Sequence, residues 1–278
     1  MSRWKKITSK RWFPMLIWII AIILLWEIAA TVVETTKRTP ENVLPHLYQI
    51  FGQIFSTKPV SSGKTATMIV LGSAGKTLYR AAIGFITGTI LGFALALIMK
   101  ISKIAEKTIF PYLMLIQMVP ILGMAPIILS ITGDINTSRI VIAAILTFYP
   151  VATNTLAGFN AVEREKYELM YSYAANKYTI YKKVLIPYSI PYFFTGLKIS
   201  APMAITASIL VDTLQGDGGL GSMLSQSLKH AMSIYVFWLI VFFSAFIGIF
   251  SAYFMGLVEK MVLPHKRKIK TKGKEDNL

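Results

Sequence analysis

The chain has 278 residues, of which 54% are hydrophobic and only 15% are charged, and its mean hydropathy is +0.57. This composition is too apolar for an ordinary soluble domain and predicts a protein that lives in a lipid bilayer. The sequence contains no cysteine, which excludes disulfides, thiolate catalysis and cysteine-ligated metals.

A helix needs about 20 apolar residues to cross the hydrocarbon core of a membrane. Six stretches of the chain satisfy this requirement, at 13–33, 78–99, 111–132, 140–159, 191–210 and 234–258. The third contains Pro120 and Pro126, which remove backbone donors and predict a kinked helix. The chain is therefore predicted to be an all-α polytopic membrane protein with six transmembrane helices and both termini on one side.

The parts outside the spans divide as follows. Residues 1–12 form a basic N-terminal segment, and the first span at 13–33 is too long for a cleaved signal peptide, so it is predicted to stay as an anchor. Residues 34–77 form a loop in which 40–55 is patterned like an amphipathic surface helix. A membrane core follows over 78–260, and 261–278 form a basic tail.

Lysine and arginine near span ends set the orientation, because basic loops are retained in the cytoplasm. The side that holds both termini carries 20 of these residues and the opposite side carries eight. The termini and the polar stretch 163–187 are therefore predicted to be cytoplasmic. The net charge of +16 belongs largely to these flanks, which favours contact with anionic lipid and not with nucleic acid.

The polar stretch 163–187 is patterned like a helix. Apolar or aromatic residues recur with helical spacing at Leu169, Met170, Tyr173, Ala174, Tyr178, Ile180, Tyr181 and Val184. A continuous helix from Tyr167 to Val184 is expected, with Lys177 on another face. Two interpretations are open for it: a linker helix that lies on lipid, or a docking helix for a cytoplasmic partner.

Short matches to enzyme motifs fail on physical grounds. The run Gly75–Thr77 resembles the end of a phosphate loop, but Val70 stands where that loop needs a glycine. Residues 216–221 fit G-x-G-x-x-G but follow a membrane helix, so a flexible turn is predicted. The three histidines lie in different loops with no carboxylate at metal-ligand spacing. The sequence therefore predicts no catalytic residue and no metal site, so hydrolysis of ATP by this chain alone is excluded.

The stretch 163–187 resembles a cytoplasmic signature, E-A-A-x(3)-G-x(9)-I-x-L-P, of permease subunits of binding-protein-dependent ABC importers. The first and last positions match, at Glu168 and Pro187. The remaining motif positions keep their spacing but differ in side chain, at Leu169, Met170, Ala174, Val184 and Ile186.

Further runs strengthen this resemblance over most of the chain. Residues 185–198 are similar to the run L-P-x(3)-P-x(4)-G-L-[RK] of the nitrate, sulfonate and taurine permease branch. Residues 219–221 stand where that branch has a G-L-G loop, and 25–27 resemble the end of its first span.

The resemblance implies a type I ABC importer permease in the bacterial inner membrane. It would act as a homodimer, with two copies of a separate ATPase below and an extracytoplasmic substrate-binding protein above. ATP and Mg would sit on the ATPase, and this chain would bind no cofactor. The motif helix, including Lys177 and Tyr178, would lie in a groove of the ATPase. Glu168 would cap or pair there, and Ala174 would allow the close approach that glycine gives.

Polar residues within the spans are candidates for the solute pathway or for helix packing. The residues that suit a cavity between subunits are Gln117, Asn154, Thr206 and Ser208. Three ionisable groups near span ends are given structural roles. Glu27 is expected to pair with another helix, Lys198 to reach the inner surface, and Asp212 to face the outer water.

The solute is not specified by the chain, since an external binding protein would make most of the selection. No basic cluster lies within the spans, which favours a heteroaromatic vitamin-type solute over a sulfonate or nitrate. The alternative function is an ion-coupled secondary transporter or channel that works without an ATPase. Such a carrier normally needs a coupling carboxylate near the membrane midplane, and no convincing one is present.

Overall fold

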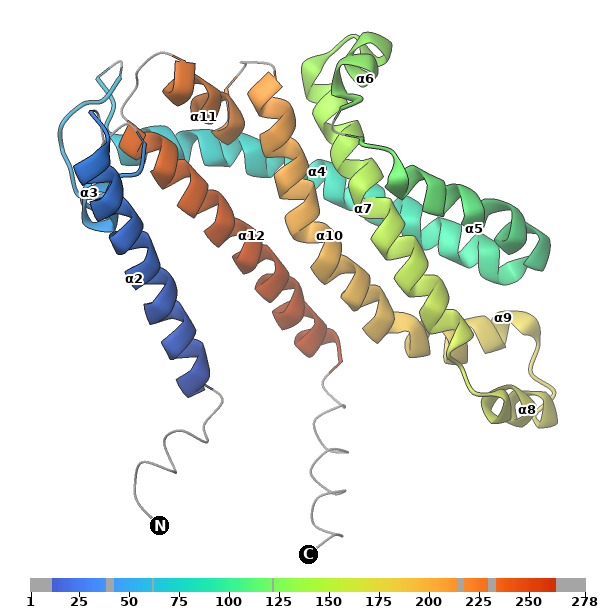
Figure 1. Ribbon diagram of the computed structural model, residues 1–278. Coiled ribbons are helices and arrows are strands. Elements are labelled where there is room, and N and C mark those ends of the chain that lie inside the picture. The colour runs from blue at the N-terminus through green and yellow to red at the C-terminus, as the bar shows by residue number, and fades with distance from the viewer. Residues whose placement is uncertain are drawn as a thin grey trace, which may run out of the picture. The chain divides into compact units, whose positions relative to one another are not determined.

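The computed structural model describes residues 12–38, 43–61, 63–121, 123–214, 218–229 and 234–263, which form helices and loops apart from one isolated bridge between Ser61 and Lys64 (Figure 1). The basic segments 1–11 and 264–278 lie outside the described residues, as do His230 and His265. The chain divides into two compact units, 1–72 with 223–242 and 73–222 with 243–278. Each unit is described by itself.

The first unit contains α2 (Trp12–Thr36), α3 (Leu47–Gly52) and parts of α4 (Ala66–Ile101), α11 (Leu220–Lys229) and α12 (Ile234–Val262). Trp26 packs edge-on against Trp238, with ring centroids 4.8 Å apart. The Glu27 carboxylate contacts a ring nitrogen of His46 at 2.6 Å and accepts the Leu47 N–H at 2.9 Å, at the start of α3. The expected pairing of Glu27 with another helix is confirmed.

The loop between the first two spans is shorter and less helical than predicted. The amphipathic helix expected at 40–55 is reduced to α3, and residues 39–42 lie outside the described residues. Helix α4 begins at Ala66, before the predicted start of the second span at 78, and Ala66–Ile101 contains no proline that would end it.

The second unit holds most of the helices. It contains α4 from Ser73 onward, α5 (Lys103–Met118), α6 (Ala125–Thr132), α7 (Ile135–Asn160), α8 (Arg164–Ser172), α9 (Lys177–Ile180), a π-helical turn η2 (Tyr181–Leu185), α10 (Ile186–Leu214) and α12 from Phe243 onward. Because α9, η2 and α10 follow without a break, they form one long helical segment.

Helices α4 and α7 run parallel and in close contact. A Cβ on Gly84 would lie 2.5 Å from the Ala143 Cβ, and one on Gly92 would lie 2.6 Å from the Phe148 carbonyl oxygen. From Gly84 to Gly92 on α4, the contacted residue on α7 changes from Ala143 to Phe148. Residue numbers therefore rise in the same direction along both helices, which makes them parallel. Only glycine allows backbones to approach so closely, as in the small-residue interfaces of membrane helices.

Helix α10 runs antiparallel to α7, since Gly158 contacts Tyr192 while Arg139 pairs with Asp212. Helix α12 in turn runs antiparallel to α10. Pro202 faces Gly248, and the Lys198 amine, on the preceding turn of α10, is paired with the Glu259 carboxylate further along α12. The C-terminal end of α12 therefore lies at the same end of the second unit as α8 and the start of α10.

Five helical segments are long and apolar enough to cross a membrane within the described residues: Phe13–Thr36, Ala66–Ile101, Ile135–Asn160, Lys177–Leu214 and Ile234–Val262. The prediction of a kinked spanning helix at 111–132 is wrong, because this segment is divided between two separate helices, α5 and α6. Val119 is extended, with φ −73° and ψ 131°, as expected for a residue before proline. Together α5 and α6 lead the chain back from the end of α4 to the start of α7.

Candidate functional site

The polar stretch 163–187 is held against the second unit by a buried apolar cluster. Its fully buried members come from α4, α5, α7, α9 and η2: Ala96, Met99, Leu113, Ala152, Leu156, Phe159, Ile180 and Leu185. Tyr167, Met170 and Ala175 pack against this cluster from outside. We call residues 164–180 the α8–α9 hairpin. It lies where α7 ends and α10 begins (Figure 1).

The expected continuous helix from Tyr167 to Val184 is wrong, because the chain turns sharply after Ser172. The Ala174 N–H donates to the Tyr171 carbonyl at 2.9 Å, and the Ala175 N–H donates to the Met170 carbonyl at 3.0 Å. These two bonds are those of a Schellman motif, which ends a helix with one left-handed residue. Asn176 then caps α9, its side chain accepting the Thr179 N–H at 2.8 Å.

Ala174 is the left-handed residue of this motif, with a φ of 51°, and it is the one non-glycine residue with a positive φ within the described residues. The family signature has glycine at this position. Glycine adopts this backbone without steric cost, whereas alanine is strained there. The left-handed backbone conformation by itself therefore accounts for a glycine at this position of the signature.

The outer face of the α8–α9 hairpin is exposed and largely apolar. Helix α8 buries none of its residues, and Leu169, Tyr173 and Tyr178 are 56%, 77% and 70% exposed. Glu168 is also exposed, and its carboxylate accepts a hydrogen bond from Arg164 at 2.9 Å. An exposed apolar surface of this kind is typical of a contact with another molecule.

The predicted coupling residues fall into two groups. Those on the exposed surface are Glu168, Leu169, Ala174, Lys177, Tyr178 and Pro187. Those that are partly buried are Met170, Val184 and Ile186, of which Met170 and Ile186 pack against the apolar cluster. The signature therefore contains two kinds of side chain. Some hold the hairpin in place, and the others are exposed and available to a partner.

Two ionisable side chains at the start of α8, Lys166 and Tyr167, have pKa values above their ordinary values. The hydrogen bond between Lys166 and Glu163, 3.0 Å long, raises the pKa of the Lys166 amine. Burial raises the pKa of the Tyr167 hydroxyl. Lys166 is therefore positive and Tyr167 neutral, so neither group is suited to proton transfer near pH 7.

A buried polar cluster lies at the opposite end of α4, α7 and α10. The Asp212 carboxylate is fully buried, 2.7 Å from Nε of Arg139 and 3.3 Å from Nη1 of Arg80. The Thr77 hydroxyl donates to Asp212 at 2.9 Å and accepts the Leu220 N–H at 2.9 Å. We call these residues the Asp212 cluster. The prediction that Asp212 faces the outer water is wrong, because two arginines neutralise it within the protein.

Glycines at 218–221 close over the Asp212 cluster. Gly219 has a φ of 119°, and a Cβ there would lie 2.1 Å from an oxygen of Asp212. A Cβ on Gly221 would lie 1.8 Å from the Ile209 carbonyl oxygen. The prediction of a flexible turn is therefore wrong for the described part of 216–221, where glycine is required by tight packing; Gly216 and Asp217 lie outside the described residues.

The predicted pathway residues are not brought together. Gln117 and Thr206 are exposed on different helices, and the Thr206 hydroxyl donates to its own helix at Pro202. The half-buried Asn154 also donates to its own helix, at 2.8 Å. Ser208 is buried and donates to the Thr77 carbonyl at 3.2 Å, which joins α10 to α4. Their place in a solute pathway stays a prediction.

Sequence reasoning missed Thr77, Arg80 and Arg139 as partners of Asp212. A signal was present, because a carboxylate next to a membrane span is costly unless it is paired. Arg80 lies at the predicted start of the second span and Arg139 directly before the fourth, and the sequence does not show that these spans contact α10. Within the described residues, no group of three or more histidine, aspartate or glutamate side chains is placed to hold a metal.

Comparison with known proteins agrees with this architecture. Residues 88–263 match the family described as binding-protein-dependent transport system inner membrane component. The formylaminopyrimidine transport permease protein ThiX of Halalkalibacterium halodurans is 28% identical over 69% of this chain and 76% of its own. The putative aliphatic sulfonates transport permease protein SsuC of Bacillus subtilis is 25% identical over 93% of this chain and 90% of its own.

Solved structures give the same fold. The methionine ABC transporter MetNI in an inward facing conformation superposes with a TM-score of 0.61 at 15% identity, over 70% of this chain and 97% of that chain. The family match covers more than half of the chain. The chain therefore belongs to this family, as a non-catalytic, multi-pass permease subunit of a binding-protein-dependent ABC importer in the inner membrane.

Proposed function

We propose that the chain works as a homodimer that forms the solute pathway and is driven by two copies of a separate ATPase, which dock on the α8–α9 hairpin. The observation that carries this proposal is the exposed apolar face of the hairpin, with Glu168 beside it, on a base buried in the second unit. ATP and Mg belong to the ATPase. A substrate-binding protein delivers the solute from outside.

The geometry of the second unit supports an orientation in which the α8–α9 hairpin and the Asp212 cluster lie on opposite sides of the membrane. Arg139 and Asn160 lie near opposite ends of α7, about 30 Å apart for a straight helix, which is the thickness of the hydrocarbon core. The Asp212 cluster and the α8–α9 hairpin then lie at opposite faces of the membrane. The excess of basic residues supports a cytoplasmic position for the hairpin.

The parallel contact of α4 with α7 supports an even number of crossings. Two parallel spans joined in sequence require the segment between them to cross back. Helices α5 and α6 are too short to cross singly, but together they cover that distance. With this interrupted crossing the chain has six passages, and both termini lie in the cytoplasm, as the charge distribution predicts.

The hairpin suits the transmission of force. Its partly buried residues, with Ile180 and Leu185, are packed against α4, α5 and α7, so movement of the docked ATPase moves the ends of these helices. Closure of the ATPase pair on ATP then favours one state of the permease by binding that state more tightly. This is a rigid-body change that exposes the pathway to one side and then to the other.

We propose a small heteroaromatic solute of the vitamin-precursor type. The two arginines near the outer ends of the spans are directed at Asp212, so they do not form a free anion site. The likeness to a formylaminopyrimidine permease is in line with this class, whereas nitrate and sulfonate permeases are also relatives. Titration of the partner binding protein with pyrimidines, riboflavin, nitrate and sulfonates tests it, and tight binding of an inorganic anion alone would contradict it.

The test of the transport function is reconstitution in liposomes with the ATPase and the binding protein. Uptake of solute is expected only when all three proteins and ATP are present. Uphill uptake by the permease alone, driven by an ion gradient, would contradict the proposal and favour a secondary transporter.

The role of the hairpin is tested by Glu168→Lys. Reversal of this exposed charge is expected to weaken ATPase docking at least tenfold, as for charge reversal at other interfaces, and to leave membrane insertion intact. The matched control is Lys107→Glu, a charge reversal at an exposed position of α5. Normal pull-down of the ATPase with unchanged stimulated hydrolysis in Glu168→Lys would refute the assignment.

A further inference from the structure

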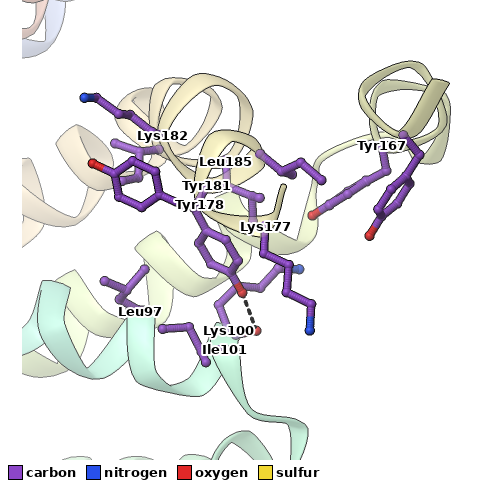
Figure 2. Close-up of a pocket in the computed structure, with 12 residues that line it drawn as sticks. Leu97, Lys100, Ile101, Tyr167, Lys177, Tyr178, Tyr181, Lys182 and Leu185 are labelled. Atoms are coloured by element: carbon purple, nitrogen blue, oxygen red, sulfur yellow. Dashed lines mark hydrogen bonds between the residues drawn. The ribbon is translucent and has the colours of Figure 1, made fainter. Parts of the chain in front are cut away.

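A cavity of about 690 Å³ opens between the end of α4, the α8–α9 hairpin and the start of α10 (Figure 2). It is lined by Leu97, Lys100, Ile101, Tyr167, Tyr171, Lys177, Tyr178, Ile180, Tyr181, Lys182, Leu185 and Ile186. Neither the family description nor the names of the relatives assign a ligand to this place.

The walls of this cavity are apolar and aromatic. Leu97, Ile101 and Leu185 supply aliphatic surface, and four tyrosine rings supply flat surface. The Tyr181 hydroxyl donates to the Lys100 carbonyl at 3.3 Å, which fixes one ring between α4 and η2 (Figure 2). Such a surface suits a hydrocarbon chain and not a small hydrated ion.

The charge of the cavity has one sign. Three of the lining residues are lysines, and no acidic side chain is among the described residues that line it. Lys177 and Lys182 are exposed, and they leave the helical segment in different directions around Tyr178 and Tyr181 (Figure 2). The Lys100 amine donates to Asn160 at 2.8 Å and keeps two further protons for another acceptor.

We propose that this cavity is a binding site for one anionic phospholipid. The acidic headgroup contacts Lys100 and Lys177, whose amines extend to the same side of the cavity (Figure 2), and part of an acyl chain lies on the apolar wall formed by α4 and η2. Basic pockets at the cytoplasmic ends of membrane helices recognise anionic headgroups in this way. The proposal rests on the cytoplasmic orientation of the hairpin given above, since α4 leaves its spanning segment at Ile101 and anionic lipid is enriched in that leaflet.

A lipid in this position has a consequence for the hairpin. Tyr167 and Tyr171 of α8 contribute to the same cavity as Leu97 of α4. The bound lipid therefore fills the space between the surface on which the ATPase docks and the end of a spanning helix. Bound anionic lipid therefore strengthens the contact between α8 and the end of α4.

The experiment measures lipid binding to the purified full-length chain by native mass spectrometry in detergent, without ATPase or solute. Phosphatidylglycerol is expected to bind at least tenfold more tightly than phosphatidylcholine. In the double variant Lys100→Gln with Lys177→Gln this preference is expected to be lost, because each lysine near an anionic surface contributes about fivefold. Arginine at the same two positions is expected to retain it.

The matched control is the double variant Lys103→Gln with Lys107→Gln, which removes two lysines of α5 outside this cavity and is expected to bind phosphatidylglycerol as the unchanged chain does. Glycerol phosphate, which has the charge without the acyl chains, is expected to compete poorly. Equal binding of the two lipids, equal loss in both double variants, or full competition by glycerol phosphate would overturn the proposal. Because no ATPase is present, failure of ATP-driven uptake leaves this result unaffected and bears on the proposed function alone.

Discussion

The two ends of the second unit hold their helices together in different ways. At the Asp212 cluster, buried charge, hydrogen bonds and close-packed glycines join α4, α7 and α10. At the α8–α9 hairpin, an apolar cluster forms the base, and the outer face is left open. One end therefore has a fixed, closely packed geometry, and the other leaves an exposed surface on which we propose that the ATPase docks.

The comparison is tested most severely by Asp212→Ala, which leaves Arg139 buried without its carboxylate. Removal of one partner of a buried ion pair costs about 3–5 kcal/mol, so we expect the thermal unfolding midpoint in detergent to fall by about 10 °C. The matched change at the other end is Glu163→Ala, which removes the exposed partner of Lys166 and is expected to change the midpoint very little.

If Asp212→Ala does not accumulate, the double variant Asp212→Ala with Arg139→Met provides the measurement. It replaces the pair by apolar side chains and is expected to recover much of the lost stability. Wild-type stability of Asp212→Ala alone would show that the buried pair does not hold these helices.

Glycine packing gives the next largest effect. We expect Gly221→Ala to destabilise by about 1–3 kcal/mol or more, because its Cβ would meet backbone atoms of α10. Gly75→Ala in α4 is the control, since nothing lies within 4 Å of its added Cβ, and alanine is favoured there by about 1 kcal/mol. The midpoints of unfolding of the two variants should therefore move in opposite directions, and equal shifts would contradict the packing described for residues 219–221.

At the open end, a substitution can relieve strain. We expect Ala174→Gly to stabilise the chain by about 1 kcal/mol, because glycine adopts the left-handed backbone of the Schellman motif without cost. The measurement is protection of the amides of 170–176 from hydrogen exchange, which should increase. Ala175→Gly, at the next position, is the control and is expected to lower protection, so an identical response of both variants would argue against the strain.

The smallest effect concerns an ion pair open to water in the first unit. The hydrogen bond to Glu27 is the main cause that raises the pKa of His46, and a weaker contact with Glu34 adds to it. A raised pKa stabilises the folded state below the ordinary value of 6.5, and this contribution is lost as the pH rises through the raised value.

We therefore expect the unfolding midpoint to decrease slightly, by less than in any of the variants above, as the pH rises through that range. Screening keeps the change small, since the Glu27 side chain is 34% exposed. His46→Gln should remove this dependence on pH. The same pH profile in that variant would assign it to another group.

Much of the fold was predictable because membrane-spanning helices appear in the sequence as long apolar runs. The third was misjudged because Pro120 makes the residue before it extended and ends the helix, whereas a kink had been expected. The Asp212 cluster escaped because Thr77, Arg80, Arg139 and Asp212 come from three helices, and no pattern within one helix reports which helices touch.

The stretch 163–187 could be singled out from the sequence, since its helical spacing and its polarity lie in one segment, and its role in coupling stays a prediction. Its internal turn was missed because alanine at 174 hides the left-handed position that glycine would have signalled. The division of the coupling residues between a buried base and an exposed face also needed the structure, because a helical pattern predicts one apolar face without telling which partner covers it.

The most direct measurement uses the absence of cysteine from the natural chain. A single cysteine at Tyr173, which is 77% exposed, is labelled with a membrane-impermeant maleimide in right-side-out and in inside-out vesicles. We predict labelling only in inside-out vesicles, and protection from it when the purified ATPase is added. Labelling from the outside, or labelling that the ATPase does not reduce, would contradict the assignment of the α8–α9 hairpin as the site where the ATPase drives this permease.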